Sequence, residues 1–140
     1  MIGLLAAAAL AVSSGYQADV TARDIGRLSF FAGVCSTLGW ESSYDRAVAG
    51  AEAWKQAHPG TIEADNVAQI ELGIADARGE LDALVLALRS DQNATAFAST
   101  LKTRCDDAAR DFPEVVNRAA DTDSKFTAAM TRIVQGNVAR

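Results

Sequence analysis

Hydrophobic residues recur along this chain at spacings of three and four, the period that places them on one face of an α-helix. The pattern predicts a helix over 19–38 that stops at Gly39, because glycine adopts the left-handed conformation common at helix ends. A second helix is predicted over about 42–57, beginning at Ser42. The His-Pro-Gly segment 58–60 then predicts a turn, since proline cannot continue a helix.

The clearest periodicity lies in residues 61–89, which we expect to form one long helix. Its apolar residues make a heptad seam, which consists of Val67, Ile70, Ile74, Ala77, Leu81, Leu84 and Leu88. Gly73 and Gly79 lie off the seam, and each is expected to weaken the helix by roughly 1 kcal/mol. The seam fits either the core of a helical bundle or a homodimer formed through Val67–Leu88.

The C-terminal third of the chain continues the helical pattern. A further helix is expected from the cap region 90–93 to Phe112, followed by a short helix over 114–120 that Pro113 would start. The last helix opens near Thr122. With two prolines and no strand-like alternation, the chain predicts an all-α fold: an up-down bundle of four main helices plus a short extra helix.

The first 15 residues have a different character from the rest. An uncharged apolar run over 2–12, followed by Ser13, Ser14 and Gly15, is typical of the apolar region and cleavage zone of an export signal. The run is shorter than the about 20 residues needed to span a bilayer. A buried first helix of a cytoplasmic protein is the alternative. We expect a signal peptide over 1–15, one helical domain over 16–140 without a membrane span, and a periplasmic or secreted protein.

The two cysteines lie on the apolar stripes of two predicted helices. Cys35 belongs to the first helix and Cys105 to the helix that ends at Phe112, so both side chains point toward the same core. An even cysteine count in an exported chain indicates a disulfide. Closing a loop of about 70 residues would stabilise the fold by roughly 4 kcal/mol. Two free thiols packed as small hydrophobes are the alternative.

Charge and composition exclude several classes of function. The formal net charge of -5 argues against nucleic-acid binding, which requires a basic surface. The single histidine, His58, and two bonded cysteines cannot supply the three or four ligands of a zinc site. Ser99 and Lys102 match the Ser-x-x-Lys pattern of penicillin-recognising enzymes, but the companion motifs are absent and the chain is too short. We therefore expect no enzymatic activity, no metal and no cofactor.

An aromatic group remains as the candidate recognition surface or pocket: Trp40, Tyr44 and Trp54, with His58 nearby. Aromatic side chains are enriched at interface hot spots and also line small-molecule pockets. A plug in the core at one end of the bundle is the alternative interpretation.

These observations lead to two hypotheses of function. The first is a small exported, non-enzymatic helical protein that binds another protein. Inhibitors, immunity proteins, chaperones and secretion accessories of this kind share its fold class and compartment, which is an analogy only. The second is a carrier that holds a small apolar or aromatic ligand between its helices.

Overall fold

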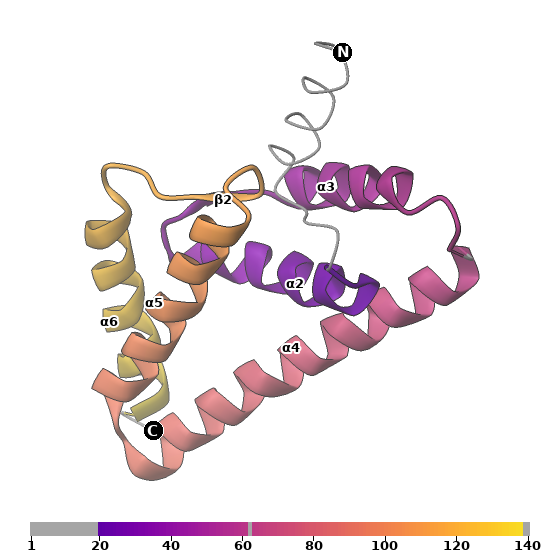
Figure 1. The fold of residues 1–140 in the computed structure, drawn as a ribbon. Helices are drawn as coiled ribbons and strands as arrows, with labels where there is room; N and C mark the ends of the chain where they lie inside the picture. The colour runs from indigo at the N-terminus through magenta and orange to yellow at the C-terminus, as the bar shows by residue number, and fades with distance from the viewer. Residues whose placement is uncertain (1–19, 62, 139–140) are drawn as a thin grey trace.

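The computed structural model describes residues 20–61 and 63–138, so the expected signal peptide lies outside the described residues. Five helices and a two-stranded ladder make up this part of the chain (Figure 1): α2 (Ala22–Leu38), β1 (Glu41–Ser42), α3 (Tyr44–Ala57), α4 (Glu63–Asp91), α5 (Ala94–Asp111), β2 (Val116–Asn117) and α6 (Thr122–Val138). The all-α prediction is confirmed, with four longer helices and one shorter one, α3, of 14 residues. Among the described helices, none has the length and hydropathy required to cross a membrane.

Local sequence explains where α2 begins and ends. The Thr21 hydroxyl accepts the amide of Asp24 and the Asp24 carboxylate accepts the amide of Thr21, which is a capping box. The helix stops at Gly39, as predicted, where φ is 115° and the amide bonds to the Cys35 carbonyl. Ser43 caps α3.

The segment after Pro113 differs from the expected short helix. The amides of Val115 and Val116 both bond to the Phe112 carbonyl, which makes a single turn. Val116–Asn117 then pairs antiparallel with Glu41–Ser42. Both valines are fully buried, and β-branched side chains favour extended backbone over a helix. This short ladder ties the segment before α3 to the segment before α6.

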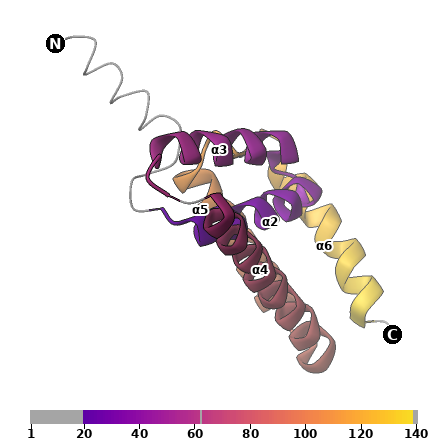
Figure 2. The ribbon, with the colours of Figure 1, turned by 90° about the vertical axis from the view of Figure 1, so that its right-hand side faces the viewer.

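Helix α2 lies at the centre of the fold and contacts all four other helices (Figures 1 and 2). Its most extensive contacts are with α4. The heptad seam of α4 faces inward: Ala77 and Leu88 are fully buried, and Ile70, Leu81 and Leu84 pack against the core. Val67, at the start of the seam, remains 44% exposed. The seam is therefore used inside the molecule, against α2 and its neighbours.

The α2–α4 crossing depends on two glycines. A β-carbon built on Gly26 would overlap the carbonyl of Ile70, and one built on Gly73 would overlap the carbonyl of Arg23. Both glycines are buried, and the two backbones touch there without intervening side chains. Gly73 therefore has a structural role in addition to its expected cost to the helix, because the close approach requires glycine at this position.

Ion pairs flank the crossing on one side. Arg23 bonds to Asp76, and Arg27 bonds to Glu80 at 2.8 Å. Arg27 lies four residues after Arg23 on α2, and its partner Glu80 lies four residues after Asp76 on α4. Because the pairs advance together along both helices, α2 and α4 run in the same general direction. The hydrogen bond from Arg23 lowers the pKa of the Asp76 carboxyl below its ordinary value. Glu80 also pairs with Arg104 of α5, which brings a third helix to this contact.

The crossing makes a direct prediction about glycine substitution. Gly26→Ala and Gly73→Ala are expected to destabilise the protein by about 1–3 kcal/mol, the usual cost of inserting a methyl group into a packed core. Gly33→Ala serves as a matched control in α2, because a β-carbon at this position meets nothing within 4 Å. The control is expected to gain up to about 1 kcal/mol from helix propensity. Urea unfolding of the three variants measures the difference, and equal stabilities would refute the close crossing.

Candidate functional site

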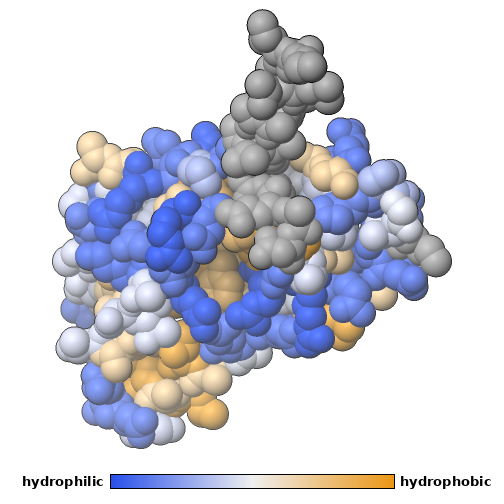
Figure 3. Space-filling model, viewed as in Figure 1, coloured by the Kyte–Doolittle hydropathy of each residue, from blue (hydrophilic) through white to orange (hydrophobic). Residues whose placement is uncertain are grey.

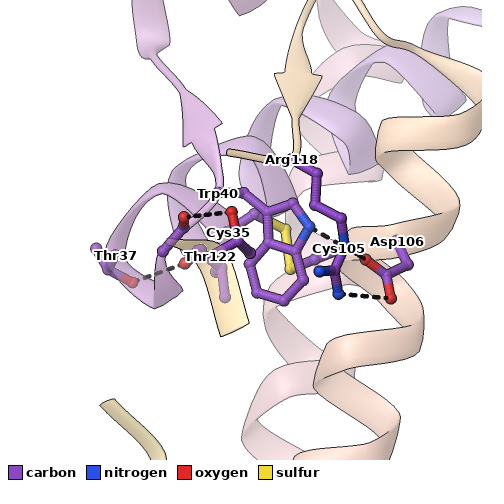
Figure 4. Close-up of a disulfide and its surroundings, with 9 residues drawn as sticks. Cys35, Thr37, Trp40, Cys105, Asp106, Arg118 and Thr122 are labelled. Carbon is purple, nitrogen blue, oxygen red and sulfur yellow. Dashed lines mark hydrogen bonds and ion pairs between the residues drawn. A yellow bond between two sulfur atoms is a disulfide. The ribbon is translucent and has the colours of Figure 1, made fainter. Parts of the chain in front are cut away.

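The predicted disulfide is present between α2 and α5. Cys35 and Cys105 are bonded, their Cα atoms lie 5.6 Å apart, and both are fully buried (Figure 4). The bond ties the C-terminal half of α2 to the middle of α5. It therefore fixes the two helices beside the aromatic and charged cluster described next.

Trp40 packs beside the disulfide and is 3% exposed. Its indole N–H donates to Asp106 at 3.3 Å, and its ring meets the ring of Phe126 edge-on at 5.5 Å between centroids. The Arg118 guanidinium lies 5.8 Å from the centroid of the Trp40 ring and donates to Asp106 (Figure 4). It also donates to Asp123. Trp40 is thus a core residue whose polar edge is covered by an ion-pair network.

The charged groups of this network form ion pairs with one another. Hydrogen bonding to Asp106 and Asp123 raises the pKa of Arg118, and the bond from Arg118 lowers the pKa of Asp123. Lys102 lies 3.6 Å from Asp123 and adds a second cation. A carboxylate held between two cations is a poor proton carrier near neutral pH. The arrangement is suited to holding α2, α5 and α6 together.

A buried hydroxyl completes the junction. Thr122 is fully buried at the start of α6, and its hydroxyl donates to the Gly39 carbonyl at 3.0 Å. The same oxygen accepts the Ala119 amide at 2.7 Å. The end of α2 and the beginning of α6 are therefore joined at a side chain whose hydrogen bonds are made inside the protein.

Trp54, His58 and Tyr44 lie outside the cluster around the disulfide, Trp40 and Arg118. Trp54 is buried, donates to the Val20 carbonyl at 2.7 Å, and stacks on the His58 ring at 4.4 Å between centroids. His58 Nδ1 lies 2.8 Å from the Trp54 carbonyl oxygen. Tyr44 is 77% exposed at the other end of α3, about 15 Å along the helix from Trp54. The structure thus pairs Trp54 with His58 and separates this pair from Tyr44 and from Trp40 at the disulfide.

A groove of about 680 Å³ between α5 and α6 is the strongest candidate site. Its floor is apolar and is formed by Ala94, Ala98, Phe126, Met130 and Val134. Its rim is mostly polar and neutral and carries Thr95, Ser99, Lys102, Thr127, Thr131 and Gln135. Figure 3 shows apolar surface over the lower left of the molecule, where α5 and α6 approach the end of α4. An apolar floor between polar rims is typical of a binding groove.

The groove exists because the residues of α5 that face α6 are small. Ala94 and Ala98 are too short to reach Phe126, Met130 and Val134 across the gap. The backbones of α5 and α6 hardly approach each other, and the two helices run in opposite directions (Figure 1). The Lys102–Asp123 pair bridges one end. The floor on each helix spans nine residues or fewer, which is about 12 Å or two turns.

Sequence reasoning missed this groove. The available signal was the pairing of an alanine-rich face on one helix with large apolar residues at 126, 130 and 134 on the next. Periodicity identifies such faces as apolar, but it does not show that they fail to meet. The aromatic residues Trp40, Tyr44 and Trp54 were instead the predicted recognition surface.

The groove shows little catalytic chemistry. Ser99 and Lys102 both line it, yet no hydrogen bond joins them, and Lys102 is paired with Asp123. Within residues 20–61 and 63–138, no three His, Cys, Asp or Glu side chains gather as a metal site would require.

Comparison with models of protein families, with curated proteins and with solved structures finds no match for this chain.

Removing the disulfide is expected to lower the melting temperature. The double substitution Cys35→Ser and Cys105→Ser opens a loop of 70 residues, which corresponds to roughly 4 kcal/mol and a shift of about 10 °C or more. Circular dichroism melts under oxidising conditions measure the change. An unchanged melting temperature would show that the bond adds nothing to the stability.

The Arg118 network predicts a loss of stability in acid. Because the pKa of Asp123 is lowered in the folded state, its contribution is present above the unfolded value of about 3.9 and is lost as the pH falls through the folded pKa. Arg118→Met removes the main cause, so its melting temperature should fall less between pH 4 and pH 2 than that of the wild type. The effect is modest because these groups are exposed. Arg46→Met, at an exposed arginine of α3, is the control, and identical pH profiles for all three proteins would contradict the assignment.

Proposed function

We propose that this is an exported, non-enzymatic protein of the inhibitor, immunity, chaperone or secretion-accessory type, which binds an amphipathic helix of another protein in the α5–α6 groove. The observation that carries the proposal is the apolar floor between two helices that hardly touch each other. A third helix laid along α5 and α6 would insert a row of side chains spaced by three or four residues and so complete a packed layer.

The shape of the groove favours a helix over a small ligand. Small-molecule sites usually enclose 70–90% of their ligand. The α5–α6 groove is open to solvent along one side, and its floor has the length of about two helical turns. The hydroxyls of Thr95, Ser99, Thr127 and Thr131 lie along its rim, where they could bond to the polar flanks of a bound helix. A carrier of small apolar ligands is the second candidate, supported by the same floor.

Two further observations support the proposal. The disulfide favours an oxidising compartment, which agrees with export. The paired state of Lys102 and of the Arg118 network leaves the groove region without an evident acid, base or nucleophile, which fits a binding role.

The test is to fill the groove and follow the partner. Ala98→Phe places a ring in the floor, whereas Thr103→Phe places the same ring on an exposed position of α5 outside the groove. We expect wild type and Thr103→Phe to capture the same polypeptide from the envelope fraction of the source cells, and Ala98→Phe to lose it at least tenfold. Melting curves of both variants establish that they are folded.

The other outcomes contradict the proposal. If all three proteins capture the same polypeptide, the partner binds away from the groove. If native mass spectrometry of the gently purified protein shows a small-molecule adduct that Ala98→Phe loses, the protein is a carrier. If no polypeptide is captured reproducibly, the protein-binding role is refuted.

A further inference from the structure

The face of α4 turned away from α2 is apolar and uncovered by any described residue. Leu72 and Leu86 are 45% and 65% exposed and lie on the side of the helix opposite its buried residues. Ala75, Gly79 and Ala83 lie between them at spacings of three and four, and all three are exposed. A β-carbon built on Gly79 would meet nothing within 4 Å. These five residues, Leu72 to Leu86, form the outer face of α4.

The position of α4 leaves this face accessible. The helix has 29 residues, which makes it about 43 Å long, and it runs along one edge of the molecule. No other described element lies on that side of α4 in either ribbon view (Figures 1 and 2). The α5–α6 groove lies at another edge, so the two surfaces can be occupied independently.

The outer face is symmetric about Gly79. Leu72 and Leu86 lie seven residues before and after it, and Ala75 and Ala83 lie four residues before and after it. In an antiparallel pair of α4 helices crossing at Gly79, each leucine would therefore meet the other leucine of the second copy. The small residues at the centre allow the two helices to approach closely.

The charges beside the outer face follow nearly the same symmetry, with their centre at position 80, one residue after Gly79. Glu71, Arg78, Asp82 and Arg89 follow one another along one edge, in the order acid, base, acid, base. Antiparallel pairing about Gly79 brings Glu71 to within about 3 Å, along the helix axis, of the level of Arg89 of the second copy, and Arg78 equally near the level of Asp82. Arginine side chains are long enough to span this offset, and the two-fold axis repeats both pairs. This edge is thus complementary to itself.

These four side chains are available for such pairing. No ion pair within the described residues uses any of them. Arg78 lies 6.0 Å from the centroid of the Phe30 ring, and Arg89 donates to Asn137 at 3.0 Å. Both contacts leave the guanidinium groups with free N–H donors for a carboxylate.

We propose that two copies of this protein form an antiparallel dimer through the outer faces of α4, with Gly79 at the two-fold axis. Leu72 and Leu86 supply the apolar contacts, and the edge charges set the direction and register. The dimer uses the face opposite the heptad seam, so it leaves the packing against α2 intact. It also presents two α5–α6 grooves in one assembly. The proposal stands whether or not the groove binds a helix.

Charge reversal tests the pairing. We expect the purified, oxidised protein to show a concentration-dependent monomer–dimer equilibrium in sedimentation velocity. Asp82→Arg places like charges together at two symmetric positions and should raise the dissociation constant roughly tenfold or more. The double substitution Arg78→Asp and Asp82→Arg should restore association. Glu114→Arg, an equal charge change in an exposed turn, is the matched control and should dimerise like the wild type.

Cysteine pairing tests the direction. On oxidation, a mixture of Leu72→Cys and Leu86→Cys proteins should form cross-linked heterodimers faster than either variant forms homodimers. Faster homodimers of each variant alone would overturn the antiparallel arrangement. A wild type that remains monomeric up to about 1 mM would overturn the dimer itself. Failure of Asp82→Arg to weaken association would show that another surface forms the dimer.

Discussion

The fold depends on the contact between the backbones of α2 and α4. Gly26 and Gly73 remove the side chains that normally keep two helices apart, so each helix lies against a carbonyl of the other. Interhelical distance is set by the side chains at the contact, and here there are none. Arg23 and Arg27 then reach Asp76 and Glu80 on α4 beside the crossing. The position of α4 relative to α2 follows from this contact.

The remaining helices are attached to α2 by different means. The disulfide joins α5 to α2, and Thr122 joins the start of α6 to the end of α2. Because each is held by α2, α5 and α6 need not pack closely against each other, and the small residues of α5 leave the gap between them open. The candidate binding groove is thus a consequence of how the helices are anchored. The outer face of α4 is free for a related reason, since the glycine crossing fixes which side of α4 is buried.

Local patterns predicted the elements well. Periodicity predicted the helices, the His-Pro-Gly segment 58–60 predicted the turn, and Gly39 predicted the end of α2, because these features depend on neighbouring residues. The expected helix over 114–120 is the exception. The cysteine pair was also predictable, since both residues lay on inward-facing stripes.

Features that depend on distant residues were not predictable. From the sequence alone, Gly73 is expected only to weaken the helix. Its role in the crossing becomes evident when Gly26 of α2 is found at the same contact. Trp40 and Trp54 are close in sequence, but Gly39 and the strand that follows direct them to different parts of the core. The α5–α6 groove required the separation of two helices, which no single stripe encodes.

The glycine crossing can be observed directly by NMR. In a NOESY spectrum of the isotope-labelled protein, the crossing predicts cross-peaks between a Gly26 Hα and the Ile74 amide proton. It also predicts cross-peaks between a Gly73 Hα and the Arg27 amide proton. A β-carbon built in place of one glycine Hα would lie 3.0 Å from the Ile74 nitrogen at Gly26 and 3.0 Å from the Arg27 nitrogen at Gly73. Observation of both sets would establish the contact on which the fold depends. Their absence from a well-resolved spectrum of the folded protein would contradict it.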